Sequence, residues 1–315
     1  MKYKYLKTNG FRDYLSPLIF GGELIVCGVD FGSSYNLASE IISAVSAQGI
    51  SKEEFTILAI KSIPKKFKKR FITFEVVKKF LLSRKAKSPL FIFLGGMAGK
   101  TLMGNFISQH LGVTQAIAID NEKFRIYDPD NSQAHLWKAV YESPDGYTMT
   151  VDALVPWMIK MIDRNLFDHS RYRKWCYFWE GIYLSPLAIK KIYHKFGQTN
   201  YFFSVFILPK FKEIKARYIL RWQKETGVEE LEKRKNYIDL YLKNIKAIRS
   251  HISENIDPVA SFVIQNIRLE KRLENFYILL HQTLEDIAEK EIPGWVNDIE
   301  LKPEKFQEFI RFLKS

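Results

Sequence analysis

A short apolar run followed directly by glycines constrains the fold of this chain more than any other feature. Residues 90–94 read LFIFL, residues 95–101 read GGMAGKT, and residues 102–112 read LMGNFISQHLG, with apolar side chains at helical spacing. A buried strand that leads through a glycine-rich turn into a helix is the opening unit of a parallel-sheet protein. The sequence therefore predicts an α/β fold built on a parallel sheet.

The glycine-rich turn has the chemistry of a phosphate-binding loop. Glycines let backbone N–H groups approach phosphate oxygens, a lysine reaches the β- and γ-phosphates, and a threonine hydroxyl binds Mg²⁺. The start of the following helix adds further N–H groups and a favourable dipole for anions. We expect the nucleotide to contact the whole loop, which comprises Gly95, Gly96, Met97, Ala98, Gly99, Lys100 and Thr101.

This loop is shorter than the common pattern G-x-x-x-x-G-K-[ST]. That pattern requires a glycine six residues before Lys100, where the chain has Leu94, and counting from Gly95 leaves three spacer residues instead of four. An ordinary glycine-rich turn, or a degenerate loop that no longer binds ATP, is therefore the alternative interpretation.

The rest of the chain alternates strand and helix signals. We expect three more strands, at residues 115–119, 175–179 and 201–208, and helices at residues 36–49, 72–85 and 150–166, with a helical tail from Glu225. Gly49 is expected to end one helix, and Ser51 with Glu54 to begin the next. A dense basic run at residues 64–70 (PKKFKKR) predicts an exposed turn, with a phosphate-contacting patch as the alternative.

Two carboxylates follow predicted strands, where parallel sheets place their sites. Asp120 can orient or deprotonate an acceptor hydroxyl, or hold Mg²⁺ through water, and the alternative is that it only caps the next helix. Glu180 can support the magnesium ion, and the alternative is a turn carboxylate. Five residues after Asp120, Arg125 can reach an anionic acceptor.

A basic helical segment follows the predicted strand at residues 201–208. Its cations can neutralise charge on a transferred phosphoryl group from a mobile lid, and a solvated basic helix face is the equal alternative. The segment carries Lys212, Lys215, Arg217 and Arg221 at helical spacing.

The charge of the chain favours anionic partners. Among 315 residues, 48 Lys and Arg outnumber 35 Asp and Glu, and the formal net charge is +13. Nucleotides, phosphorylated metabolites and nucleic acid fit this charge, and a lysine-rich solvated surface is the alternative. The two cysteines, Cys27 and Cys176, exclude a disulfide framework. Because no signal peptide or membrane-spanning run is evident, we expect a cytoplasmic protein without membrane contact.

The order of these motifs resembles the archaeal 2-phosphoglycerate kinase family of P-loop kinases. The loop and its helix up to Gly112 resemble that family's first unit, and EGIYLSP at residues 180–186 resembles its third strand end. Arg217-Tyr218 with Arg221 resembles its RF-x-x-R segment, and residues 234–248 resemble its following helix. In addition, residues 16–41 resemble the truncated ATP-cone segment that precedes the kinase domain in the family.

The resemblance implies a three-layer α/β P-loop kinase domain at residues 88–315, preceded by a small helical ATP-cone-like domain at residues 1–87. It implies transfer of the γ-phosphoryl group of ATP, with Mg²⁺, to 2-phosphoglycerate, which gives 2,3-bisphosphoglycerate. Lys100 and Thr101 would hold the phosphates and Mg²⁺, and Glu180 would support the metal. The implied roles of the other candidates are positioning of the acceptor hydroxyl by Asp120 and clamping of the acceptor and transferring phosphates by Arg125, Arg217 and Arg221.

The chain also departs from the family pattern. Its loop is two residues shorter than that of the family, and Tyr183 and Ile214 stand where the family has histidines. These departures favour a different acceptor or weak catalysis. An RNA or polynucleotide kinase and a catalytically degenerate nucleotide-binding protein are the alternative functions.

Overall fold

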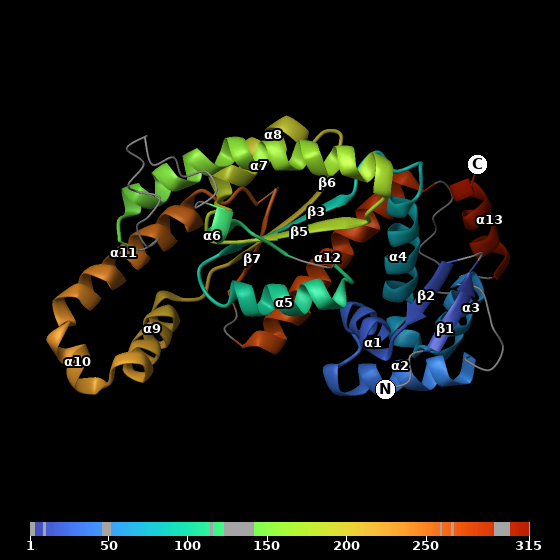
Figure 1. The fold of residues 1–315 in the computed structure, drawn as a ribbon, viewed down its shortest axis with the longest axis horizontal. Coiled ribbons are helices and arrows are strands. Elements are labelled where there is room, and N and C mark those ends of the chain that lie inside the picture. The colour runs from blue at the N-terminus through green and yellow to red at the C-terminus, as the bar shows by residue number, and fades with distance from the viewer. Residues whose placement is uncertain are drawn as a thin grey trace.

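A five-stranded parallel sheet forms the centre of the molecule (Figure 1). Its strands are β3 (Leu90–Gly96), β4 (Ile117–Ala118), β5 (Cys176–Glu180), β6 (Tyr201–Ile207) and β7 (Phe262–Ile264), in the spatial order β4-β5-β3-β6-β7. The parallel α/β fold that the sequence predicts is thus confirmed. The computed structural model describes residues 4–8, 11–45, 52–113, 116–122, 142–258, 260–265, 268–292 and 303–314.

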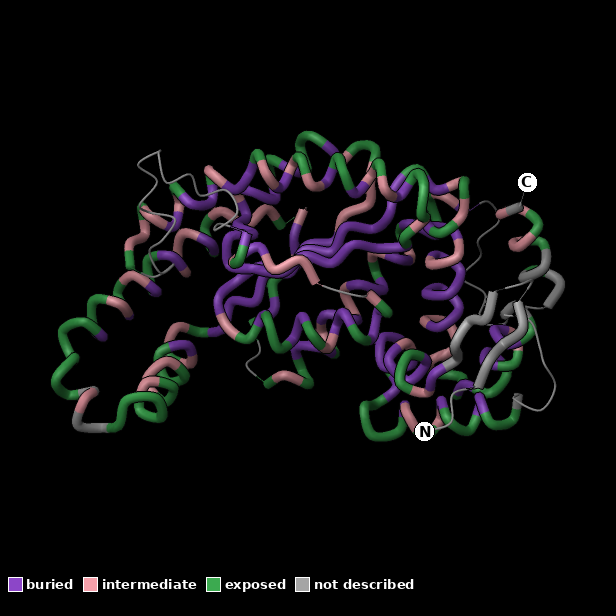
Figure 2. The backbone as a smooth tube through the Cα atoms, in the orientation of Figure 1, coloured by how far each residue is buried: buried purple, intermediate pink, exposed green. Residues whose placement is uncertain are grey.

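Helices cover both faces of the sheet, because the central strand is apolar on both sides. On one face, Leu90, Ile92 and Leu94 pack with α5 (Lys100–His110) and α12 (Leu269–Glu291). On the other face, Phe91 and Phe93 pack with side chains of α7 (Pro144–Tyr172), α8 (Pro186–Phe196) and α11 (Lys235–Glu254). The buried strands between these two helical layers are visible as the purple centre of Figure 2.

The N-terminal segment packs on the same face as α5 and α12. It contains the antiparallel strands β1 (Lys4–Thr8) and β2 (Phe11–Leu15), followed by α1 (Pro17–Val26), α2 (Phe31–Val45), α3 (Lys52–Ser62) and α4 (Lys65–Leu82). Apolar residues of these four helices share one buried cluster with β3, α5 and α12. The strand pair corrects the expectation of a purely helical beginning.

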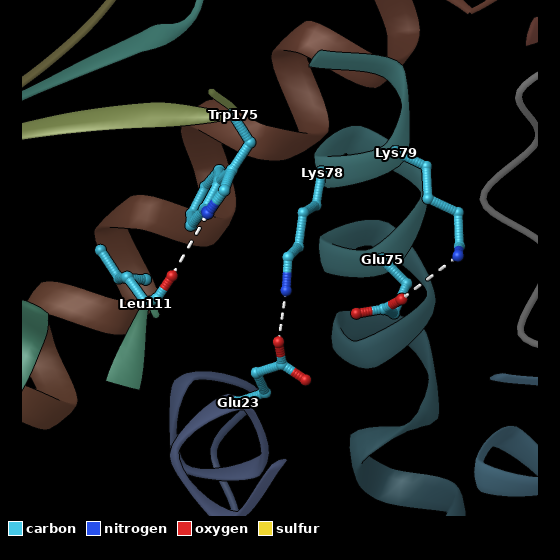
Figure 3. A network of polar contacts seen from close by, with 6 residues as sticks. All are labelled: Glu23, Glu75, Lys78, Lys79, Leu111 and Trp175. Carbon is cyan, nitrogen blue, oxygen red and sulfur yellow. Dashed lines mark hydrogen bonds and ion pairs between the residues drawn. The ribbon is translucent and has the colours of Figure 1, made fainter. Parts of the chain in front are cut away.

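Polar contacts reinforce this packing (Figure 3). Lys78 in α4 forms an ion pair with Glu23 in α1. Within α4, Nζ of Lys79 lies 3.9 Å from Oε2 of Glu75, one turn earlier. The indole N–H of Trp175, just before β5, donates to the carbonyl oxygen of Leu111 at 3.2 Å. These contacts connect α1 to α4 and the end of α5 to the residue just before β5.

The basic run at residues 64–70 is a helix, and the predicted turn is wrong. Pro64 precedes the first residue of α4, where its fixed φ of −55° suits a helix start. Phe67, Phe71 and Phe74 then recur at helical spacing and face the core, with Phe71 and Phe74 buried. Lys65 and Lys66 are exposed, and Lys68 and Lys69 are half-buried, so a basic composition hides a helix with one buried face.

The other predicted elements agree with the structure to different degrees. The strands expected at residues 175–179 and 201–208 are β5 and β6, whereas β4 has only two residues because α6 (Ile119–Glu122) begins directly after it. The helical tail predicted from Glu225 begins within the last turn of α9 (Phe211–Thr226). It continues through α10 (Val228–Lys233), α11, α12 and α13 (Pro303–Lys314). It also contains β7, which is too short to show an alternating pattern. Gln115, Gly49 and Ser51 lie outside the described residues.

No helix in the described part of the chain combines the length and the apolar character that crossing a membrane requires.

Candidate functional site

The glycine loop lies at the point where the chain leaves the sheet in opposite directions. After β3 the chain enters α5 on one face, whereas β5 and β6 are followed by α8 and α9, whose apolar side chains pack on the other face. Parallel sheets bind ligands at the carboxyl ends of their strands where such connections diverge. The loop that the sequence singles out therefore occupies the position that the topology favours for a ligand.

Two glycines of the loop have backbone conformations that require glycine. Gly96 has a φ of 106°, and a methyl group on its Cα would collide with the carbonyl oxygen of Ile207 in β6. Gly99 has a φ of 75° and precedes the first residue of α5. The next amide after Gly96, that of Met97, donates to the Ile207 carbonyl at 3.0 Å. The start of the loop is thus hydrogen-bonded to β6, and its end continues directly into α5.

Lys100 lies beside Asp120 in the structure. The lysine is the first residue of α5 and its side chain is 9% exposed, with Nζ 3.9 Å from Asp120 Oδ2. The other oxygen of Asp120 accepts a hydrogen bond from the backbone N–H of Ile182 at 2.6 Å. This bond fixes the Asp120 carboxylate at the end of β5, and Asp120 is the second residue of α6 and not the residue before it.

Thr101 and Glu180 form the second polar pair of the site. The threonine hydroxyl donates to Glu180 Oε1 at 3.4 Å, and Oε2 of Glu180 is buried and has no hydrogen-bond partner within the described residues. Burial raises the pKa of Glu180; Lys100 opposes this shift and the charge of Asp120 adds to it. A hydroxyl next to a buried carboxylate oxygen suits a divalent cation that keeps several waters, as Mg²⁺ does.

Mg²⁺ would be held by few protein ligands here. Among the described residues no group of three or more His, Cys, Asp or Glu side chains is arranged to bind a metal ion. A site of one hydroxyl and one or two carboxylates, completed by water and by substrate phosphates, is the usual arrangement for Mg²⁺ in phosphoryl transfer. The residues present are therefore compatible with the predicted metal.

Two arginines from different helices approach Gly99. The buried Arg272 of α12 donates from Nη1 to the carbonyl oxygen of Ala98 at 2.8 Å. A methyl group on Gly99 would lie 2.5 Å from Arg272 Nη1 and 3.7 Å from Nη1 of Arg217 in α9. Burial and, to a lesser extent, the charge of Arg217 together lower the pKa of Arg272 to about 10. Positive charge therefore accumulates at the beginning of α5.

The structure brings only some of the predicted cations together. Arg217 lies at the loop, but Arg221, one turn further along α9, forms an ion pair with Glu225 at 2.7 Å on the exposed surface of the helix. Lys212 and Lys215 are also exposed. Arg125 lies outside the described residues. Of the predicted clamp residues that the structure describes, Arg217 lies at the loop and Arg221 does not.

Sequence reasoning missed Arg272. Its signal was an arginine on the apolar face of a helix, four residues after Arg268 and four before the buried Phe276, with Leu273 beside it. A charged residue on such a face is seldom left without a role, because burying its charge is costly. The pattern alone, however, does not say which part of the fold this face meets.

Two buried tyrosines lie within the electrostatic influence of Asp120. Tyr183, at one of the positions where the resembling family has histidine, is buried and stacks on Tyr147 of α7 with ring centroids 5.9 Å apart. The hydroxyl of Tyr147 donates to the carbonyl oxygen of Ile182, whose own N–H donates to Asp120. Burial raises the pKa of both tyrosines, and the charge of Asp120 raises it further.

Comparison with family models, with curated proteins and with solved structures gives no match for this chain.

Proposed function

We propose that this protein is an ATP-dependent phosphotransferase that moves the γ-phosphoryl group to a hydroxyl of a small anionic acceptor. One observation carries the proposal. Lys100 and the two arginines Arg217 and Arg272 converge on a glycine loop at a helix start, and two carboxylates, Asp120 and Glu180, adjoin it. Cations for phosphates, a metal-binding pair and a carboxylate for an acceptor hydroxyl are the parts that phosphoryl transfer needs.

Each residue has a role that its position allows. The Lys100 amine, fixed at the start of α5, would bind the β- and γ-phosphates. Thr101 and Glu180 would hold Mg²⁺, which neutralises phosphate charge when it is bound. Arg217, exposed on α9, would contact the transferring group from outside.

Asp120 would orient the acceptor. Its carboxylate is anchored by the Ile182 amide and lies next to Lys100, so it faces the phosphate end of the site. An acceptor hydroxyl bound there would give its proton to Asp120 as its oxygen attacks the γ-phosphorus, and the bond from that phosphorus to the bridging oxygen would break to release ADP. The resemblance to 2-phosphoglycerate kinases makes 2-phosphoglycerate the first acceptor to test. Because Tyr183 and Ile214 replace two histidines of that pattern, other small phosphorylated hydroxy compounds are the next acceptors to test.

Binding and turnover of ATP test this proposal. We expect Lys100→Ala to weaken MgATP binding by about tenfold or more in calorimetry, because a charge-assisted contact is lost. Lys87→Ala, an exposed lysine just before β3, is the matched control and should bind within about twofold of the original protein. Unchanged binding in Lys100→Ala would show that the loop does not hold phosphates.

Acceptor assays separate the remaining possibilities. ATP consumption with 2-phosphoglycerate, but not with an oligoribonucleotide, is the expected result. Consumption with the oligoribonucleotide alone, weakening steeply with salt, would instead indicate the polynucleotide kinase that the net charge of +13 also allows. Binding of MgATP without turnover on any acceptor would indicate a degenerate nucleotide-binding protein.

A further inference from the structure

Arg272 is unusual in this protein because it is charged and buried. It is 1% exposed and is the only buried arginine among the described residues. It belongs to α12, where Leu273 and Phe276 pack in the same core as β3 and α5. A guanidinium in such surroundings needs fixed partners, and the Ala98 carbonyl is one of them. The helix that carries Arg272 is therefore anchored in the core, and the guanidinium bonds to the loop.

The bond from Arg272 orients the shortened loop. In a trans peptide the carbonyl and the following N–H point in opposite directions. Because Arg272 fixes the carbonyl of Ala98, it also fixes the direction of the Gly99 N–H, which belongs to the same peptide unit. The loop has one spacer residue fewer than the common pattern, so each remaining amide matters more for binding. Arg272 thus determines how one of these amides is presented.

Arg217 adds a second guanidinium at the same glycine. It lies on α9, in which Ile214 is the only buried residue identified, whereas Arg272 lies on a helix with a long buried face. The two positive charges act on each other across Gly99. A ligand with several adjacent negative groups can reach both guanidiniums as well as Lys100, whereas a single phosphate at Lys100 reaches fewer of these charges. A chain of phosphates therefore complements this arrangement best.

We propose that Arg272 is a positioning residue that braces the shortened loop through Ala98 and, together with Arg217, selects ligands with two or more linked phosphates. This inference rests on the proposed function, since it concerns the same loop. The ligand class is a polyphosphate, which includes nucleoside di- and triphosphates and inorganic tripolyphosphate. Arg272 acts on the loop, whereas Lys100 binds the phosphates directly.

Calorimetry on the full chain with three probes tests the proposal. Tripolyphosphate and ATP report on linked phosphates, and AMP reports on a single phosphate. We expect Arg272→Met to weaken tripolyphosphate and ATP binding by about tenfold or more and AMP binding by less than about threefold. Arg272→Lys keeps the charge but loses the planar fork, and should weaken ATP binding by about threefold to tenfold. Lys271→Met, which removes the adjacent exposed lysine paired with Glu274, is the matched control and should bind as the original protein does.

The other outcomes would contradict the bracing role of Arg272. Equal losses for AMP, ATP and tripolyphosphate in Arg272→Met would show a merely structural role, and wild-type affinities would show no role. If Arg272→Met does not fold, Arg272→Lys decides, because wild-type affinity in that variant overturns the bracing role. Loss of binding in Lys100→Ala with wild-type binding in both Arg272 variants overturns this inference alone. Failure of the unaltered protein to bind either ATP or tripolyphosphate overturns the proposed function as well.

Discussion

Lys78 in α4 and Glu23 in α1 form an ion pair whose side chains are only 20% and 12% exposed (Figure 3). Burial lowers the pKa of Lys78, but the charges of Glu23 and Glu75 outweigh it, so the pKa lies above its ordinary value. The pair therefore stays charged throughout the neutral range. It joins the N-terminal helices to the helix that leads into the central strand.

Breaking this pair should destabilise the fold. Glu23→Gln removes the carboxylate paired with Lys78 and leaves only the charge of Glu75 to oppose its burial. We expect the free energy of unfolding to fall by about 2–3 kcal/mol, between the values of surface and buried pairs. Glu285→Gln, which breaks the more exposed pair with Lys69, is the control and should cost less than about 1 kcal/mol. Urea denaturation measures both, and equal effects would contradict the importance of burial.

The two backbone glycines Gly96 and Gly112 should respond differently to alanine. Both have a positive φ, but a methyl group on Gly112 meets no atom within 4 Å, whereas one on Gly96 collides with the Ile207 carbonyl. We expect Gly112→Ala to cost about 1 kcal/mol from its backbone conformation alone. Gly96→Ala should cost at least about 2 kcal/mol more and should impair ATP binding. Comparable thermal unfolding of the two variants would show that the loop can shift away from β6.

Two buried histidines should make the protein sensitive to acid. Burial lowers the pKa of His110 and of His281 to about 4 in the folded protein, against about 6.5 in an unfolded chain. Between these values the unfolded state binds more protons, so the free energy of unfolding falls as the pH drops from about 6.5 to about 4. Each histidine contributes up to about 3 kcal/mol to this loss, which levels off below pH ~4.

Urea midpoints measured from pH 4 to pH 7 test this behaviour. His281→Gln, which removes the imidazole bonded to the Val26 carbonyl, should flatten the pH dependence, and the buried His110 and His169, whose pKa values burial also lowers, should maintain the rest. His194→Gln, in the last turn of α8, is the control and should leave the slope unchanged. An unchanged slope in His281→Gln would assign the acid sensitivity to other groups.

Glu180 should matter for the metal more than for the nucleotide. We expect Glu180→Gln to reduce the effect of Mg²⁺ on ATP affinity by about tenfold, while ATP binding without Mg²⁺ changes by less than about threefold. The substitution keeps the shape of the side chain and removes a buried charge, so the fold should persist. Calorimetry with and without Mg²⁺ gives both affinities, and the exposed Glu40→Gln is the control. Equal losses in both conditions would remove Glu180 from the metal site.

The sequence predicts the parts of the site that are local in the chain. The strand, loop and first helix are continuous, so the apolar run and the glycines suffice to locate β3 and the start of α5. Glu180 follows from the same reasoning, because it ends a recognisable strand. Asp120 and Lys100 come from elements that the parallel order places at one edge, and their proximity follows from topology.

Arg272 could not be predicted in the same way, since its partner Ala98 lies on a segment far away in sequence. The helical spacing of Lys212, Lys215, Arg217 and Arg221 likewise does not say which of these side chains reaches Gly99. The missed strands β1, β2 and β7 are short, and their stability comes from neighbours and not from their own composition. The residues that surround the loop, and the short strands, are thus determined by packing between distant segments, which local sequence patterns do not reveal.

The pairing of β3 also has a consequence for biosynthesis. Leu90 pairs with Cys176 on one side and with Tyr201 on the other, so both neighbours of the central strand are translated more than 80 residues later. During that interval the segment LFIFL, which carries no charge and no proline, is present in the nascent chain without its two neighbouring strands. Such segments self-associate readily. We therefore expect this chain to depend on chaperones that shield residues 90–94 until the ribosome has released the second half of the sheet.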